Sequence, residues 1–281
     1  MRQLIIKLLL GLCMGAALPV CAQDAVHYYF RTMDIRNGLS QNTVYQILQD
    51  RKGFMWFGTK DGLNRYDGLS FRIYKKENSG LGKNFITALY EDCRGNIWIG
   101  TDGGVFIYDP VLDSFTAFDE ASDNGSIIRD FVTMIGSDED DNIWISVENQ
   151  GLFCYKPDEG RLLNHLHDSG LPNVTRFWLN GNTCWLALYA DNLYYTKDNF
   201  ETPLQPFKDA EGNEIFKNDI INWQVGGPHN CVYIASLNGL TEINLTTGKT
   251  RKLLDTYVRA LQFKSDNELW VGAESGLYIY N

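Results

Sequence analysis

DRKGFMWFGTKDGLNRY, from Asp50 to Tyr66, is the stretch of this sequence that decides the fold. It returns as DCRGNIWIGTDGGVFIY from Asp92 to Tyr108. Each stretch opens with a polar turn, continues with a Trp inside a short apolar run, and closes with a Gly turn and a second apolar run. Less regular copies end at Tyr155, Thr196, Ile243 and Tyr280. Self-similarity at a roughly fixed period indicates a repeat architecture.

Each copy carries one central aromatic residue, 37–48 residues after the one before it. These residues are Trp56, Trp98, Trp144, Trp185, Tyr233 and Trp270. The first full unit, residues 42–75, contains four short apolar segments separated by Gly/Asp/Asn turns, and none is long enough for an ordinary helix. Four antiparallel strands at this period describe one blade of a β-propeller. We therefore predict an all-β propeller of four-stranded antiparallel blades over residues 23–281.

Six blades are visible in the sequence, and the last one is incomplete. HYYFRTM, residues 27–33, is rich in β-forming aromatics and predicts a lone strand. That strand could serve as the missing fourth strand of the last blade, which would remove two exposed sheet edges. Whether the ring has six blades or forms part of a seven-bladed ring stays open.

Residues 1–22 have the pattern of a secretory signal peptide. Arg2 and Lys7 accompany the apolar run LIIKLLLGLCMGAAL, and Val20-Cys21-Ala22 fits a cleavage site before Gln23. A membrane anchor is disfavoured because the run is shorter than the roughly 20 residues that span a bilayer. A lipoprotein attached through Cys21 is the weaker alternative, since Val20 stands where a small residue is preferred.

Charge and cysteine usage narrow the range of partners. The formal net charge is −10, and it becomes −12 when Arg2 and Lys7 leave with the leader. No Lys/Arg-rich run is present, so we expect no nucleic-acid contact. Four cysteines remain after the leader, at different places within the repeat, and predict no essential disulfide. His165-x-His167 would share one face of a strand, which is weak support for a metal; we predict no metal and no cofactor.

The recurring residues have structural explanations. A large aromatic on the second strand fills the space between neighbouring blades, so we interpret the six aromatics as packing residues. The Asp residues of the repeat are interpreted as turn residues. The Leu of the Gly-Leu pair is predicted to lie in the core, at Leu63, Leu152, Leu240 and Leu277.

Function is expected where the units differ, on loops held by the scaffold. The start of each first strand and the loop before it would line one mouth of the central channel. Amide and guanidinium donors beside aromatics there suit sugar hydroxyls and uronate carboxylates. The candidate ligand-binding residues are Asn42, Asn84, Arg129, Arg176, Trp178, Trp223 and Arg259. The alternative reading of each is an ordinary solvated or inter-blade residue.

An enzyme is disfavoured, and we predict no catalytic residue. Most acidic residues recur in turns, whereas glycoside hydrolysis needs two carboxylates across a bond. Gly follows Asp50 and Asp92 at three residues, not at the two of the sialidase Asp-box. No GxSxG nucleophile elbow and no phosphate-binding loop occurs.

GLSQNTVYQILQDRKGFMWFGTKDGLNRYDG, from Gly38 to Gly68, resembles the two-component regulator propeller repeats. The resemblance is most specific in the first two units. It is weak in the fourth and fifth, where Asn192 replaces the Gly and Tyr233 replaces the Trp.

The resemblance implies the periplasmic sensor region of a hybrid two-component receptor of the kind common in Bacteroidetes. Such sensors bind oligosaccharides from a polysaccharide, dimerise in the full-length receptor, and signal through a transmembrane helix to a histidine kinase. Neither the helix nor the kinase is evident in this sequence, so we expect a fragment of a longer receptor whose membrane attachment lies downstream. The alternatives are a secreted interaction scaffold without a small ligand and, less favoured, a carbohydrate-active enzyme.

Overall fold

The computed structural model describes residues 28–167 and 173–280. The chain divides into two compact units, which meet between Met33 and Asp34. The signal peptide expected over residues 1–22 lies outside the described residues.

The strand predicted over residues 27–33 is not formed by residues 28–33, the part that the structure describes. Tyr29 is 95% exposed there. β-Propensity reflects packing on a pleated, half-buried surface, and aromatic composition alone does not supply a paired neighbour. The sixth sheet accordingly contains three strands, and the expected closure by residues 27–33 is wrong for the described residues.

The described residues 34–167 and 173–280 form six antiparallel sheets, each in simple up-and-down order. The prediction of an all-β propeller with four-stranded blades and an incomplete last blade is confirmed. Blade one contains β1 (Val44–Gln49), β2 (Met55–Thr59), β3 (Gly62–Tyr66) and β4 (Phe71–Tyr74). Blade two contains β5 (Ile86–Glu91), β6 (Ile97–Thr101), β7 (Gly104–Asp109) and β8 (Ser114–Ala117). Blade three contains β9 (Val132–Ser137), β10 (Ile143–Val147), β11 (Gly151–Lys156) and β12 (Arg161–Asn164).

The later blades repeat this order with less regular outer strands. Blade four contains β13 (Val174–Asn180), β14 (Thr183–Leu188), β15 (Leu193–Thr196) and β16 (Gln205–Pro206). Blade five contains β17 (Ile221–Gly227), β18 (Cys231–Ser236), β19 (Gly239–Asn244) and β20 (Thr250–Leu254). Blade six contains β21 (Val258–Ser265), β22 (Glu268–Ala273) and β23 (Gly276–Tyr280).

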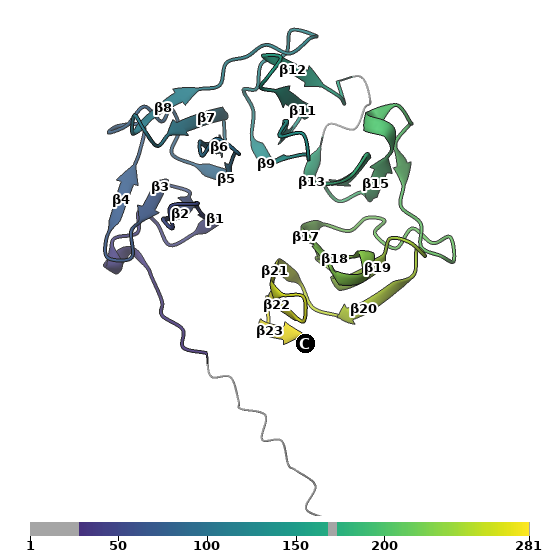
Figure 1. Ribbon diagram of the computed structural model, residues 1–281. Coiled ribbons are helices and arrows are strands. Elements are labelled where there is room, and N and C mark those ends of the chain that lie inside the picture. The colour runs from purple at the N-terminus through teal and green to yellow at the C-terminus, as the bar shows by residue number, and fades with distance from the viewer. Residues whose placement is uncertain (1–27, 168–172, 281) are drawn as a thin grey trace, which may run out of the picture. The chain divides into compact units, whose positions relative to one another are not determined.

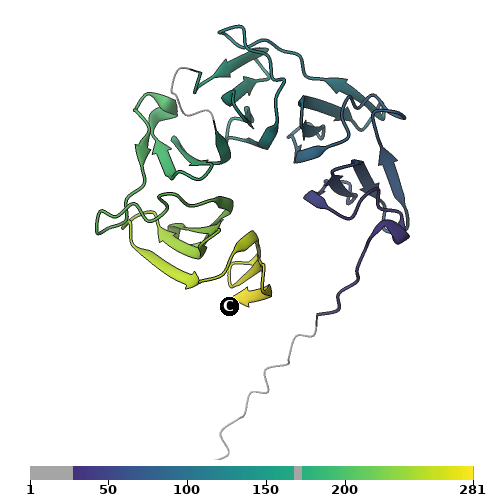
Figure 2. The same cartoon turned by 180° about the vertical axis from the view of Figure 1, so that it is seen from behind.

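The first strand of every blade faces the middle of the arc that the blades make. β1, β5, β9, β13, β17 and β21 contact one another in chain order, and both ribbon views show them on the inner side (Figures 1 and 2). The core is divided among the seams between blades, where the buried apolar side chains of neighbouring sheets form separate clusters.

A glycine begins the third strand of every blade except the fourth, and each of these five glycines has a positive φ. Gly239 has φ +129°, and a Cβ on it would meet the Leu254 carbonyl oxygen at 1.9 Å, so only glycine fits this turn. The Leu that follows is fully buried at Leu63, Leu152 and Leu240. Leu277 is 48% exposed, which corrects the prediction for that residue. It lies on β23, the edge strand of the three-stranded sixth sheet.

The Asp of the repeat does more than shape a turn. Asp92 Oδ1 accepts hydrogen bonds from the backbone N–H groups of Arg94 and Asn96, while Oδ2 accepts from Trp98 Nε1 at 3.0 Å. The same Asp–Trp bond occurs in blade one at Asp50 and in blade three at Asp138. Each carboxylate therefore fixes the turn and the inter-blade Trp together. Only the first of these two roles is predicted from the sequence.

Candidate functional site

All six inner strands carry a β-bulge near their first residues, where the pairing with the second strand skips one position. A bulge interrupts the regular alternation of side chains and re-aims the residue that it contains. The skipped residues are Tyr45, Thr87, Thr133, Thr175, Asn222 and Arg259.

Bulge residues in two blades connect their blade to the next one. Thr133 Oγ1 donates to the Val174 carbonyl oxygen at 2.8 Å, and Asn222 Nδ2 donates to the Val258 carbonyl oxygen at 2.9 Å. In both cases the acceptor is the first residue of the neighbouring inner strand. The bulges thus help to hold the inner ring together.

The inner strands enclose a cavity of about 200 Å³, the axial cavity. Its lining comes from β1, β5, β9, β13 and β17, the first strands of five consecutive blades. The lining residues are Gln46, Thr87, Ala88, Leu89, Tyr90, Thr133, Met134, Ile135, Arg176, Trp223 and Gln224.

Arg176 is the one charged residue among those that line the axial cavity. Its guanidinium Nε donates to the Asn222 carbonyl oxygen at 2.8 Å, and Nη1 donates to the carbonyl oxygens of Thr133 and Thr175. The guanidinium also lies 5.4 Å from the ring centre of Trp223. Arg176 therefore bonds to backbone in three blades and stacks on an aromatic face.

The charge of Arg176 has no carboxylate partner among the described residues, because its acceptors there are all backbone carbonyls. Arg176 is half-buried and lines the cavity. The protein around it still removes water, and this desolvation lowers the pKa of Arg176 to about 10. The guanidinium stays cationic at neutral pH, so the cavity holds an uncompensated positive charge.

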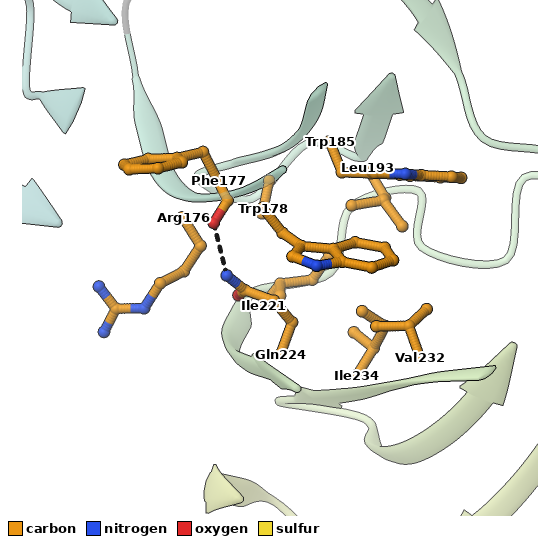
Figure 3. Close-up of a pocket in the computed structure, with 10 residues that line it drawn as sticks. Arg176, Phe177, Trp178, Trp185, Leu193, Ile221, Gln224, Val232 and Ile234 are labelled. Atoms are coloured by element: carbon orange, nitrogen blue, oxygen red, sulfur yellow. Dashed lines mark hydrogen bonds between the residues drawn. The ribbon is translucent and has the colours of Figure 1, made fainter. Parts of the chain in front are cut away.

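Two further polar atoms of the axial cavity are buried without a hydrogen-bond partner in the described structure. They are Thr87 Oγ1 and Gln224 Oε1. The Gln224 amide nitrogen, by contrast, donates to the Phe177 carbonyl oxygen at 2.7 Å (Figure 3). Native proteins leave few buried polar atoms unsatisfied, so two in one cavity indicate a place for a polar group that is not part of the chain.

The structure brings two of the predicted site residues, Arg176 and Trp223, together in the axial cavity. Trp178 lies instead in the seam between blades four and five, stacked on Trp185 with ring centres 5.8 Å apart. The space beside it is apolar and about 10 Å³, room for about one water at most. In Figure 3 Arg176 points away from the apolar residues Leu193 and Val232.

The other four predicted residues lie outside the axial cavity, and each has a local partner. Asn42 Oδ1 accepts from the Ile35 backbone N–H, and Asn84 Oδ1 accepts from the Lys76 N–H. Arg129 forms an ion pair with Asp119 at 3.1 Å. Arg259 stacks on Tyr257 at 4.7 Å.

A larger, more polar cleft of about 670 Å³ lies between blades three and four. His165 and Trp144 line this cleft, and their rings form a stacked cluster with Phe200, in which the His165 ring centre lies 5.0 Å from that of Trp144 and 4.6 Å from that of Phe200. Burial lowers the pKa of His165. β12 ends at Asn164, so His165 and His167 follow a strand instead of sharing one of its faces. Among the described residues no group of three or more His, Cys, Asp or Glu could hold a metal.

Sequence reasoning missed Thr87 and Gln224, which complete the axial cavity. Thr87 is a bulge residue, and the sequence gives no sign of a bulge because pairing partners cannot be read from one strand. Gln224 follows Trp223, and alternation would place the two side chains on opposite faces of the strand. The bulge at Asn222 precedes both, and both line the cavity.

The two component regulator propeller family matches residues 38–61 and 80–103. A histidine kinase P4 of Formosa agariphila is 42% identical over 59 residues, which is 21% of this chain and 4% of that protein.

Solved structures extend the likeness over most of the chain. The extracellular domain of BT3049 from B. thetaiotaomicron, a predicted hybrid two component system, is 25% identical with a TM-score of 0.74. The superposition covers 89% of this chain and 35% of that one. PorZ, a surface component of the type-IX secretion system of Porphyromonas gingivalis, gives a TM-score of 0.66 at 14% identity, covering 85% of this chain and 38% of PorZ, which shows a shared fold alone.

The fold and the repeats define a β-propeller, and two of its repeats match the two component regulator propeller family. The chain spans about a third of the BT3049 extracellular domain to which it is similar. All its strands belong to propeller blades in the described residues, and the histidine kinase domain of such receptors is not among them. No helix in the described part of the chain has the length and apolar character needed to cross a bilayer.

Proposed function

We propose that this chain is the ligand-sensing region of an extracytoplasmic two-component receptor and that its ligand is an oligosaccharide derived from a polysaccharide. The observation that carries the proposal is the likeness to the extracellular domain of a hybrid two component system along 89% of the chain. The axial cavity supports it, because it offers guanidinium, hydroxyl and amide groups beside an aromatic face. Such a combination suits a hydroxylated ligand.

In this proposal the leader at residues 1–22 exports the chain to the periplasm. The kinase and the membrane-spanning helix belong to other parts of the full-length receptor, through which the protein dimerises. Ligand binding transmits a signal only if the ligand has different affinities for two arrangements of that dimer. The propeller itself contacts no nucleic acid.

Calorimetric titration with a panel of plant and host oligosaccharides tests the proposal. We expect at least one of them to bind the folded chain with a Kd in the micromolar range or tighter. Titrations into the urea-unfolded chain give the baseline. Silence from the whole panel with a folded protein would contradict sensing and favour an interaction scaffold, and release of reducing sugar would favour an enzyme.

A further inference from the structure

We propose that the axial cavity binds the carboxylate of an acidic sugar, with Arg176 as the residue that recognises the charge. The anion site follows from the geometry around Arg176. The identification of its ligand as a sugar rests on the proposed sensing function.

The first step concerns the donors that Arg176 has left. A guanidinium carries five N–H groups in a planar fork. Nε and Nη1 make the bonds to backbone carbonyls, whereas Nη2 makes none with the described residues. Arginine favours planar bidentate recognition of carboxylates, so an anion at this edge would supply both the missing acceptor and the missing negative charge.

The second step concerns the cost of leaving the site empty. A charge taken out of water without a counter-charge is unfavourable, and three neutral carbonyls only partly compensate it. No acidic residue lines the axial cavity, so the chain provides no counter-ion at this place. An external anion is therefore the group that completes the site.

The third step separates an acidic sugar from a simple anion. Gln224 Oε1 is a buried acceptor without a donor, and Thr87 Oγ1 is a buried hydroxyl without a partner. A fully deprotonated inorganic anion such as sulfate brings no donor for Gln224, and a neutral sugar leaves Arg176 uncompensated. A carboxylate attached to a ring with hydroxyl groups satisfies all three residues.

Size and shape agree with one sugar unit. The cavity of about 200 Å³ is smaller than the roughly 300–1,000 Å³ of pockets that enclose drug-sized ligands. Trp223 contributes an aromatic surface beside the guanidinium. We infer that a single uronic acid residue enters the cavity and that any remaining sugar units stay outside it.

The test compares sugars that differ in one group. The chain is titrated with D-glucuronate and D-galacturonate and with their neutral counterparts D-glucose and D-galactose, at constant ionic strength. We expect the uronates to bind at least tenfold more tightly. Arg176→Gln should abolish this preference, while Arg161→Gln, at an exposed arginine that begins β12 and is outside the cavity lining, should keep it.

Folding of each variant is checked by circular dichroism and urea unfolding. If Arg176→Gln does not fold, Thr87→Val decides, because it keeps the charge and the shape but removes one hydroxyl. We expect it to weaken uronate binding about three- to tenfold. Unchanged binding in Thr87→Val would then overturn the assignment to this cavity.

Other outcomes separate the inference from the proposed function. If neutral sugars bind as tightly as uronates, the inference of an acidic ligand is overturned but the proposed sensing function still stands. The same conclusion follows if Arg176→Gln folds and still binds uronates. Thermal stabilisation by acetate that depends on Arg176, with silence from every sugar, would support the anion site and contradict saccharide sensing. Silence from acetate and uronates together would overturn the inference.

Discussion

Blades one to three and blades four and five use the same strand order but differ in how the second strand is anchored. In the first group a carboxylate joins each turn to the buried Trp of its blade, as Asp92 does for Trp98. In blade four the position six residues before Trp185 is Leu179, and in blade five Tyr233 donates instead to Glu242 at 2.8 Å. Blades one to three therefore keep the Asp–Trp hydrogen bond of the repeat, and blades four and five lack it.

The departures coincide with the candidate site. Arg176, Trp223 and Gln224 all come from the inner strands of blades four and five. The regular blades supply Thr87 and Thr133 to the same cavity, on positions that every blade shares through its bulge. The comparison shows that common features of the repeat build the wall, while features specific to two blades supply the charge and the aromatic surface.

The largest expected effect is on the anchor of the regular blades. Asp92→Ala removes four hydrogen-bond acceptor contacts around a buried turn, from the backbone of Arg94 and Asn96 and from the side chains of Asn96 and Trp98. We expect the free energy of unfolding to fall by about 2–4 kcal/mol, because hydrogen bonds to a charged group are strong and the indole N–H is left buried. Urea unfolding followed by Trp fluorescence measures this loss.

Asp209 is the matched control in the less regular region. It accepts the same kind of turn bonds, from Glu211 N–H and Asn213 N–H, but it bonds to no Trp and is only half-buried. Asp209→Ala should shift the urea midpoint much less than Asp92→Ala. Equal shifts would break the comparison between the two groups of blades.

Two substitutions in the axial cavity are expected to change the free energy of unfolding by smaller amounts and in opposite directions. Thr87→Val removes a buried hydroxyl without a partner in the described structure, and it should raise the free energy of unfolding by about 1 kcal/mol when no ligand is present. Thr133→Val breaks the bond to the Val174 carbonyl oxygen and should lower it by about 1 kcal/mol. Differential scanning calorimetry of the two variants provides the test. A loss of stability in Thr87→Val would show that its hydroxyl is satisfied within the protein.

The smallest expected effect is a pH dependence at the boundary between the two regions. Burial beside Trp144 and Phe200 lowers the pKa of His165 below 6.5, while Asp123 opposes the shift and Lys156 adds to it. At a pH between the pKa of His165 in the folded chain and its higher pKa in the unfolded chain, the unfolded chain binds the proton and the folded chain does not. Stability contributed by neutral His165 is therefore complete above pH 6.5 and is lost as the pH falls towards the folded pKa.

Urea midpoints at pH 7.5 and pH 5.5 measure this dependence. His165→Phe keeps the aromatic stack and removes the titrating group, so its midpoint should change less between the two values. His167→Phe, two residues along, is the control and should keep the original difference. An identical pH response in His165→Phe would assign the dependence to other groups.

The repeat made the fold predictable, because its turns and central aromatic residue recur along the chain. The apolar segments between the turns are too short for ordinary helices, so strands are the elements that fit. The sixth blade was predicted less well. Leu277 has the sequence of a core residue, but β23 has no fourth strand beside it. Burial depends on neighbouring strands as much as on the residue, and a short motif does not carry that information.

Only part of the candidate site could be predicted. Arg176 and Trp223 were accessible because long polar and aromatic residues at the start of inner strands stand out from the repeat. Thr87 was not, since its importance comes from a missing hydrogen bond that Thr133 makes in the next blade. An absence of that kind can be seen only after both strands are placed.

Arg176 donates to carbonyls of blades three, four and five, and this has a mechanical consequence. A ligand that moves the guanidinium would strain its hydrogen bonds to three of the six blades at once. Binding at this one side chain would then change how rigidly the inner strands are held, so the cavity is placed to affect the mechanics of the propeller.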